Sequence, residues 1–558
     1  MKNLTMQPLR SEPNWAKCAC ALLFLFVTTA IALPAQTFTT LANFPESHGA
    51  NPRLMSLVQG ADGNFYGTTC DLGCVGEVGN GFGTVFKVTP TGTLTTLYSF
   101  CAQPKCTDGA FPIAGLVLGT DGNFYGTTAY GGVNDDGTVF KITSGGTLTT
   151  LHSFDLTDDG AYPYATLVQA TNGNFYGTTS YGGANAYGTV FEITPGGTLT
   201  TLYSFDDTDG AYPEAALVQA SNGNFYGTTF EGGANFDGTV FSITSGGTLT
   251  TLHSFDGTDG YLPLGALVQA NGDFYGTTVE GGANGYGTVF KITPGGTLTT
   301  LHSFDSTDGA LPEAGLVQAT NGIFYGTTLN GGANDACAVG CGTVFSITSG
   351  GTLTTLHSFD STDGDDPYGG LVQATNGTFY GTTDAGGANA GGTIFSLAVG
   401  LGPFVKTLPT SGKVGAAVTI LGTNLMGATS VSFNGTAASF TVVSSSEITT
   451  TVPTGATTGK VKVVTPGATL SSNLSFRVTP VILSFSPTSG PVGTSVVITG
   501  NSLTGATSVA FGGVKATSFT VNSYTQITAT VPTGAKTGKI GVTTPGGSAT
   551  STGTFTVN

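Results

Sequence analysis

Phe175-Tyr-Gly-Thr-Thr179, followed by Gly188-Thr-Val-Phe191 and Thr198-Leu-Thr-Thr-Leu202, is the stretch of sequence that decides the fold. Each of these three short motifs recurs seven times, at intervals of about 50 residues. The second and third motifs vary slightly between copies. The first starts at Phe65, Phe124, Phe175, Phe225, Phe274, Phe324 and Phe379, the second at Gly83, Gly137, Gly188, Gly238, Gly287, Gly342 and Gly392, and the third at Thr37, Thr93, Thr147, Thr198, Thr248, Thr297 and Thr352. A fixed period of this kind predicts a tandem array of one structural unit.

Each unit is predicted to form four strands, because short Thr- and aromatic-rich runs alternate with turn residues. In the third unit the expected strands are 165–169, 174–179, 188–194 and 198–205. Asn-Gly or Asp-Gly separates the first two strands of every unit, as at Asn172-Gly173. That dipeptide favours a type I′ hairpin turn, which needs positive φ at both central residues. Four strands in about 50 residues are typical of one propeller blade.

The order of the pieces predicts a closed ring. The array opens with a fourth strand, Thr37–Phe44, that has no earlier strands of its own unit, and it ends near Leu397 after a third strand. The opening strand can therefore pair with the last blade and complete it. This pairing covers the free edge of each of the two strands that it joins. An open β-solenoid is the alternative fold, and it does not predict this complementary offset.

The repeat resembles the GloVer-type tandem repeat of exported bacterial proteins. The resemblance rests on Leu-Val-Gln-Ala, Asn-Phe-Tyr-Gly-Thr-Thr, Gly-Gly-Ala-Asn and Gly-Thr-Val-Phe, recurring in that order over residues 37–400. Members are described as "choice-of-anchor" proteins, which implies export and surface display but no known activity. We therefore expect a seven-bladed β-propeller over 36–402.

The composition changes after Gly402, where two segments align at an offset of about 78 residues. Short alternating strands between turns indicate a β-sandwich in each. Pro409-Thr-Ser-Gly412 matches Pro487-Thr-Ser-Gly490, and Ser430-Val-Ser-Phe433 matches Ser508-Val-Ala-Phe511. These patterns resemble the IPT/TIG immunoglobulin-like family, whose modules serve as spacers or protein-interaction units. The expected fold class is thus all-β, with a propeller followed by two sandwiches at 403–478 and 479–558.

Residues 1–35 are predicted to be a secretory signal peptide. A basic leader precedes an apolar run, 18–33, that is short for a membrane-spanning helix and is followed by Pro34. The small residues Ala30, Ala32 and Ala35 offer cleavage sites. No later segment is long and apolar enough to span a membrane, so we expect a secreted or cell-surface protein. A formal charge of −17 disfavours nucleic acid and anionic membranes as partners.

Six cysteines follow the leader, in three close pairs within inserted loops. An oxidising compartment favours local disulfides. The expected pairs are Cys70–Cys74, Cys101–Cys106 and Cys337–Cys341. Pairing of Cys70 or Cys74 with Cys101 or Cys106 is an alternative. Zinc is disfavoured because no histidine is adjacent to these cysteines.

Repeated Asp-x-Thr-Asp-Gly segments lie in the loops that join one blade to the next. Closely spaced carboxylates suit calcium, whereas an Asp-Gly turn explains the same residues without an ion. The calcium candidates are Asp206, Asp209, Asp256, Asp259, Asp305, Asp308, Asp360 and Asp363. His152, His253, His302 and His357 share one repeat position with Tyr98 and Tyr203, which favours a structural ring over a catalytic one.

The blade order brings the Asp-rich loops and the cysteine pairs to one face of the ring. No nucleophile elbow, phosphate loop or zinc-helix motif occurs. The sequence therefore predicts a non-catalytic binding or scaffold protein that recognises a glycan or a protein through this face, without a cofactor. A polysaccharide-acting lyase or hydrolase and a purely structural envelope component are the alternatives. A deep channel lined by non-repeated His, Tyr and carboxylates would favour the enzyme.

Overall fold

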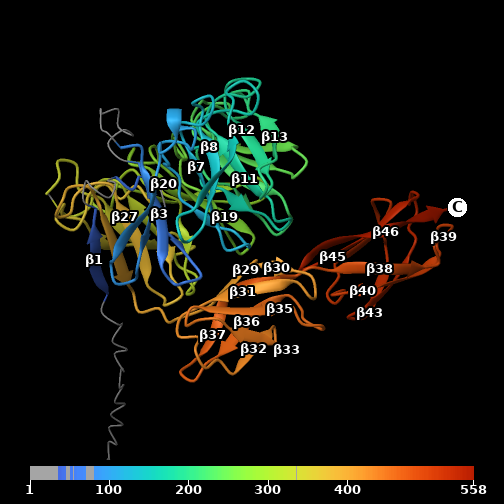
Figure 1. Ribbon diagram of the computed structural model, residues 1–558. Coiled ribbons are helices and arrows are strands. Elements are labelled where there is room, and N and C mark those ends of the chain that lie inside the picture. The colour runs from blue at the N-terminus through green and yellow to red at the C-terminus, as the bar shows by residue number, and fades with distance from the viewer. Residues whose placement is uncertain (1–35, 45–50, 54–55, 71–80, 335) are drawn as a thin grey trace, which may run out of the picture. The chain divides into compact units, whose positions relative to one another are not determined.

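The computed structural model describes residues 36–44, 51–53, 56–70, 81–334 and 336–558, so the expected signal peptide at 1–35 lies outside it. The described chain consists of strands and loops, apart from one 3₁₀ turn, η3 (Pro104–Cys106) (Figure 1). A search of these residues for a helix long and apolar enough to cross a membrane finds none.

Seven four-stranded antiparallel sheets follow one another, as the repeat predicts. The innermost strands are β2 (Val58–Gln59), β6 (Val117–Leu118), β10 (Val168–Gln169), β14 (Val218–Gln219), β18 (Val268–Ala270), β22 (Val317–Gln318) and β26 (Val372–Gln373). The second strands are β3 (Phe65–Thr69), β7 (Phe124–Thr128), β11 (Phe175–Thr179), β15 (Phe225–Thr229), β19 (Asp273–Thr278), β23 (Phe324–Thr328) and β27 (Phe379–Thr383). The third strands are β4 (Thr84–Val88), β8 (Thr138–Ile142), β12 (Thr189–Ile193), β16 (Thr239–Ile243), β20 (Thr288–Ile292), β24 (Thr343–Ile347) and β28 (Thr393–Ala398). The outer strands are β5 (Leu94–Ser99), β9 (Leu148–Ser153), β13 (Leu199–Ser204), β17 (Leu249–Ser254), β21 (Leu298–Ser303), β25 (Leu353–Ser358) and β1 (Thr37–Asn43).

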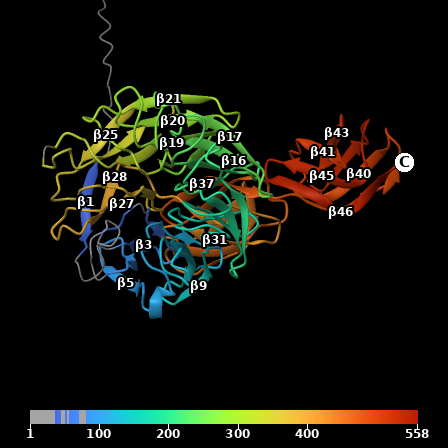
Figure 2. The same ribbon diagram turned by 90° about the horizontal axis from the view of Figure 1, so that it is seen from above.

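The first strand of the described chain closes the ring, which confirms the prediction. β1 pairs antiparallel with β28, with Thr37 opposite Ala398 and Asn43 opposite Thr393. The seventh sheet therefore has the order β1-β28-β27-β26. Figure 2 shows β1, in blue, beside β28 and β27.

The core consists of separate apolar clusters between neighbouring blades. One of them joins Phe44, Tyr380 and Ile394 of the last blade to Phe65 and Phe86 of the first. The Phe-Tyr dipeptide explains the regular contact, because each tyrosine stacks on the phenylalanine of the next blade. Tyr176 lies 4.0 Å from Phe225 between ring centroids, and Tyr380 lies 4.1 Å from Phe65 across the closure. Aromatic pairs of this geometry add to the apolar area they bury.

The glycine after each Phe-Tyr is required by packing. A Cβ on Gly177 would lie 2.7 Å from both the Phe191 ring and the Leu167 side chain. Any larger residue would therefore push the second strand away from the third strand and from the start of the first strand.

The turn between the first two strands differs from the predicted type I′ turn in six blades. In the third blade Gly173 donates to the Ala170 carbonyl at 2.9 Å, and Gly173 has a φ of 90° while Asn172 does not have positive φ. This is a type I turn followed by a glycine bulge. One extra residue before the dipeptide makes the loop three residues long. The fifth blade lacks that residue, and there Asn271 (φ 53°) and Gly272 (φ 94°) form the predicted turn.

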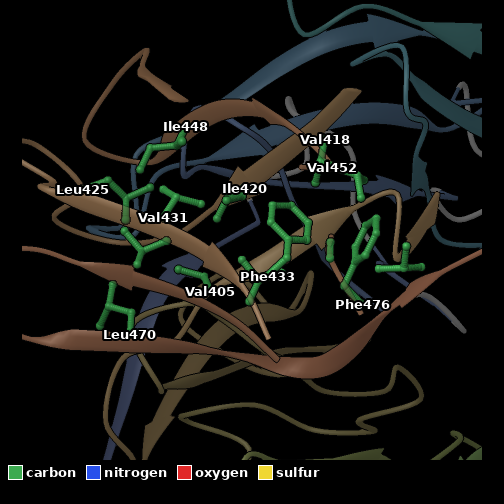
Figure 3. Packing of buried hydrophobic residues seen from close by; sticks show 14 residues of the cluster. Val405, Val418, Ile420, Leu425, Val431, Phe433, Ile448, Val452, Leu470 and Phe476 are labelled. Atoms are coloured by element: carbon green, nitrogen blue, oxygen red, sulfur yellow. The ribbon is translucent and has the colours of Figure 1, made fainter. Parts of the chain in front are cut away.

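Two β-sandwiches follow, each with a four- and a five-stranded sheet in the same order. The strands of the first are β29 (Lys406–Leu408), β30 (Ser411–Gly412), β31 (Ala417–Leu421), β32 (Ser430–Phe433), β33 (Thr436–Ala438), β34 (Phe440–Val442), β35 (Glu447–Thr451), β36 (Gly459–Val464) and β37 (Thr469–Val478). Those of the second are β38 (Val481–Ser486), β39 (Ser489–Gly490), β40 (Ser495–Asn501), β41 (Ser508–Phe511), β42 (Val514–Lys515), β43 (Phe519–Ser523), β44 (Gln526–Thr530), β45 (Gly538–Thr544) and β46 (Gly547–Val557). Phe433 and Phe476 meet edge to face at 5.0 Å inside the first sandwich (Figure 3).

Candidate functional site

The loops that connect second to third strands and those that connect one blade to the next lie on one face of the ring, as expected. Isolated bridges join the two kinds of loop within a blade, for example Ala161 with Tyr181 and Ala211 with Glu231. We call this surface the loop face. Every candidate site considered below lies on it or at its centre.

Two of the three expected disulfides lie within the described residues. Cys101 is bonded to Cys106 and Cys337 to Cys341. The third expected pair includes Cys74, which is outside the described residues. Each observed disulfide loop forms one wall of a pocket between two blades. The pocket beside Cys106 has a volume of about 730 Å³, and the pocket beside Cys337 about 580 Å³.

The calcium candidates form hydrogen-bonded turns. Asp206 Oδ1 accepts from the Thr208 hydroxyl at 2.7 Å and from the Thr208 amide at 3.1 Å, and the hydroxyl contact is the largest cause that lowers the pKa of Asp206. Asp209 Oδ1 accepts from the Asp206 amide at 3.1 Å. The same bonds recur in the turns at Asp256, Asp305 and Asp360.

An ion at these turns would have to displace the bonds just described. Among the described residues, the metal-ligand set of three or more side chains within mutual reach is Cys337, Cys341 and Asp365, and its two sulfurs form a disulfide. Calcium binding by the turn aspartates therefore stays a prediction that requires rearrangement.

Each of the four repeated histidines contacts an aspartate, a partner that the sequence did not predict. His253 Nε2 lies 2.7 Å from Asp259 Oδ2, and equivalent contacts join His152 to Asp159, His302 to Asp308 and His357 to Asp363. Tyr98 fills the same repeat position and donates its hydroxyl to Asp108 Oδ2 at 2.7 Å. Histidine and tyrosine thus perform one task, which is to anchor the loop between blades to the outer strand.

This equivalence gives a first prediction. His253→Tyr is expected to leave the free energy of unfolding within about 0.5 kcal/mol of the parent, because a tyrosine hydroxyl can reach Asp259. His253→Leu removes the partner of a partly buried carboxylate and should cost about 1 kcal/mol. Urea denaturation followed by circular dichroism measures both. Equal losses in the two variants would contradict the anchoring role.

The ring axis holds a cavity of about 90 Å³ lined by residues from six blades. Its acidic and aromatic side chains come from one repeat position, the residue that follows the proline before each innermost strand. That position holds Arg53, Ile113, Tyr164, Glu214, Leu264, Glu313 and Tyr368 in blade order. Tyr164, Glu214, Leu264, Glu313 and Tyr368 line the cavity. A repeat that is nearly constant elsewhere therefore holds five different residue types at the position where it meets the axis.

Burial perturbs the carboxylic acids around this axial cavity. It raises the pKa of Glu214 to about 7, although the Ser180 hydroxyl donates to Oε1 at 2.9 Å and opposes the rise. Burial likewise raises the pKa of Glu313 to about 7, with Arg53 opposing the rise. For Asp366 and Asp384 burial raises the pKa to about 6. These acids therefore change charge near neutral pH.

Arg53 is held against an aromatic ring beside these acids. Its guanidinium lies 4.6 Å from the centroid of Tyr368, and Nη2 donates to the Tyr368 hydroxyl at 3.5 Å. Burial is the largest cause of a rise in the pKa of Tyr368 to about 12, and Arg53 opposes it. The cation is thus positioned by stacking and by a long hydrogen bond.

Seven aromatic rings form a continuous arc across the loop face. Adjacent members contact one another with centroid separations of 4.8 to 6.1 Å. In order they are Phe82, Phe111, Tyr130, Tyr162, Tyr181, Tyr212 and Tyr187. Phe82, Tyr130 and Tyr181 are exposed, at 39%, 37% and 41%. We call this set the aromatic arc.

Part of the aromatic arc is built on strained backbone. Phe111, Tyr162 and Tyr212 have φ between 55° and 57°, a left-handed conformation that bulky residues rarely adopt. Each precedes the proline that leads to the axis. The same conformation recurs at the equivalent position of the other blades and therefore belongs to the repeat as a whole; those residues are Asn51, Leu262, Leu311 and Asp366.

The fold and this loop face define the class of the protein, a seven-bladed β-propeller followed by two immunoglobulin-like sandwiches. The family model for the Gloeobacter/Verrucomicrobia repeat matches residues 28–222 and 215–395, and the IPT/TIG domain matches 404–478 and 480–557. The chain therefore belongs to the Gloeobacter/Verrucomicrobia repeat family, with two IPT/TIG domains after the repeats. No curated protein matches the chain.

Several solved structures are similar in part. A fungal alcohol oxidase of the AA5 family, in complex with copper, covers 79% of this chain and 98% of its own at 14% identity and a TM-score of 0.47. A putative 6-phosphogluconolactonase from Bacteroides uniformis covers 54% and 83% at 17% identity and a TM-score of 0.37. A surface glycan-binding protein from Prevotella bryantii covers 27% and 41% at 20% identity and a TM-score of 0.22. At these TM-scores the likenesses carry no argument about function.

Proposed function

We propose that this protein is a non-catalytic glycan-binding protein that acts outside the cell and holds its ligand on the loop face of the propeller. The observation that carries the proposal is the aromatic arc. Contacting, partly exposed rings present flat apolar faces, and the five tyrosines of the arc each add a hydroxyl at the ring edge. Sugar rings have the complementary character, with apolar C–H faces and hydroxyls around the rim. The disulfides of the loop face support an oxidising location.

The surroundings of the arc favour a glycan over a protein. The pocket at its start is lined by Phe82, Phe111 and Tyr130 together with the polar Asn134 and Asp135. Its volume of about 730 Å³ lies in the range of small-molecule sites.

Loss of one ring of the arc is expected to weaken glycan binding at least tenfold, since central aromatic side chains dominate binding energies. Tyr181→Ala is the test, because Tyr181 contacts both Tyr162 and Tyr212. Isothermal titration against a panel of neutral oligosaccharides measures the effect.

The matched control is Tyr286→Ala, which removes a tyrosine of similar exposure, 43%, outside the arc. It should bind like the parent. The proposal fails if the folded parent binds no member of the panel, or if both variants lose affinity equally.

A second candidate function, a polysaccharide lyase or hydrolase, is favoured by the axial cavity. Tyr164, Glu214, Glu313 and Tyr368 line a single cavity, and other blades hold Arg53, Ile113 and Leu264 at the same repeat position. Release of new chain ends from a polysaccharide incubated with the parent protein would establish this class in place of the first.

A further inference from the structure

The loop that leads into the seventh blade contains the one Asp-Pro bond of the sequence, between Asp366 and Pro367. A peptide bond of this kind can be cut by the carboxyl group that precedes it. That group reaches the main-chain carbonyl carbon of its own residue, and the proline nitrogen leaves as a basic secondary amine. The other six blades have no carboxyl group before the proline, because they hold Asn51, Phe111, Tyr162, Tyr212, Leu262 and Leu311 there.

Two main-chain donors hold the carbonyl oxygen of Asp366. The amides of Tyr368 and Asp384 each donate to it at 2.9 Å. Two N–H groups at this distance polarise a carbonyl and stabilise the negative charge that its oxygen gains when the carbon is attacked. In blades two to six of the described chain the equivalent carbonyl accepts one such bond, from the amide of Ala129, Ser180, Phe230, Val279 or Leu329.

The carboxyl group of Asp366 is not committed to another contact. Among the described residues no donor is hydrogen-bonded to it, and the groups that act on it do so through burial and charge. The amide of Asp366 itself donates to Asp365 Oδ1 at 3.0 Å, which fixes the backbone on the N-terminal side of the bond. The nucleophile is therefore free to turn toward a carbonyl that is held in place.

Burial also keeps this carboxyl group protonated in mild acid. It raises the pKa of Asp366 to about 6, and the neighbouring Asp365 and Asp384 add to the rise while Arg53 opposes it. The titratable groups that interact with Asp366 are Asp365, Asp384, Arg53, Glu313 and Tyr368. A carboxylic acid can supply both the attacking oxygen and the proton that the leaving nitrogen needs.

We propose that this chain cuts itself between Asp366 and Pro367. One carboxyl oxygen of Asp366 attacks the main-chain carbonyl carbon of the same residue. The C–N bond to Pro367 breaks, and the carboxyl proton passes to the proline nitrogen. The cyclic anhydride that remains takes up one water molecule and opens, so that Asp366 becomes a C-terminus and Pro367 an N-terminus.

The seventh blade would keep the two products together. β1 belongs to the N-terminal product, whereas its partner β28 belongs to the C-terminal product, with β27 and β26 beside it. The two sandwiches follow β28 in the same product. The cut thus replaces the covalent link between the first six blades and the sandwiches by the hydrogen bonds between β1 and β28.

The test compares cutting of the folded and the unfolded chain. The purified full chain is moved to about pH 5.5, below the midpoint of the buried carboxyl group, and is sampled by denaturing gel electrophoresis and mass spectrometry. Two fragments should appear, one ending at Asp366 and one beginning at Pro367. The same chain unfolded in urea keeps the bond and lacks the two donors, so the folded chain should be cut at least roughly tenfold faster. Equal rates, or an uncut folded chain, would overturn the proposal.

Asp366→Asn is the matched variant, because asparagine already occupies the equivalent position in the first blade. Asn51 has a φ of 60°, and its carbonyl accepts from the amides of Arg53 at 2.8 Å and Cys70 at 3.2 Å. The variant should therefore fold, as circular dichroism verifies, and stay uncut. Asp158→Asn, an exposed change in the loop before the third blade, should be cut at the parent rate. Cutting of Asp366→Asn at that rate, or fragments that map to another bond, would show that Asp366 is not the nucleophile.

Discussion

Replacing Phe44 with alanine is expected to lower the free energy of unfolding of the propeller by about 3–5 kcal/mol. Phe44 is fully buried and meets Phe86 of the first blade at 5.1 Å. It lies directly after β1, in the cluster that joins the last blade to the first. The substitution therefore leaves a cavity at the point of ring closure. Urea denaturation followed by tyrosine fluorescence measures it, because all tyrosines except Tyr524 precede the sandwiches.

Two controls locate the effect. Phe154→Ala removes the equivalent buried ring from inside the array, 5.3 Å from Phe191, and should cost a similar amount. Phe38→Ala removes a half-buried ring that stacks on His357, and about 1 kcal/mol is expected. A loss below about 1 kcal/mol for Phe44→Ala would contradict closure by β1.

Glu214→Gln is expected to stabilise the protein by about 2–3 kcal/mol at pH 8 and to have little effect near pH 4.5. Burial raises the pKa of Glu214 to about 7 in the folded protein, from an ordinary value of 4.5. The folded state thus binds the proton more tightly, and the parent loses stability as the pH rises from about 4.5 to 7. The amide carries no charge, and its oxygen can still accept from Ser180.

Denaturation midpoints across pH 4.5–8 measure this difference. Glu280→Gln, at an exposed position, should follow the parent at every pH. If the curves of Glu214→Gln and the parent stay parallel, the carboxyl of Glu214 does not titrate as its burial implies.

The ring and its closure could be predicted from the sequence because they depend on repeated residues. Phe175, Tyr176 and Gly177 have the same neighbours in every blade, so one alignment determines seven packing contacts. The motif of the fourth strand occurs once before the first complete unit and does not follow the last third strand, so the sequence shows both the extra strand and the gap that it fills. Neither conclusion needed knowledge of side-chain orientation.

Local geometry was harder to predict where one residue changes the turn. Asn-Gly or Asp-Gly indicated a type I′ turn in all blades. In the third blade, however, the residue before Asn172 lengthens the loop, and only Gly173 has positive φ. The innermost strand was also expected from Ala165, whereas β10 begins at Val168. Ala165 and Thr166 line the axial cavity, where sheet pairing has already ended.

The axial cavity was not predicted, because the sequence comparison used the residues that are constant between repeats and the cavity is lined by residues that vary. The sequence favoured a structural role for His253 and its equivalents, but their aspartate partners are separated from them by a loop whose path the sequence does not show. The signal for the axial cavity was present in the position after each proline, where Arg53, Glu214 and Tyr368 replace one another. Only closure of the ring shows that this position faces the axis.

The pairing of Thr37 with Ala398 also determines the order in which the chain can complete its fold. A growing polypeptide exposes β1 first, and its partner β28 is made only after six blades have been synthesised. During that interval β1 is a free edge that can add to the unfinished seventh blade of another copy. Slow or interrupted synthesis should therefore produce strand-exchanged dimers in which each ring is completed by its neighbour.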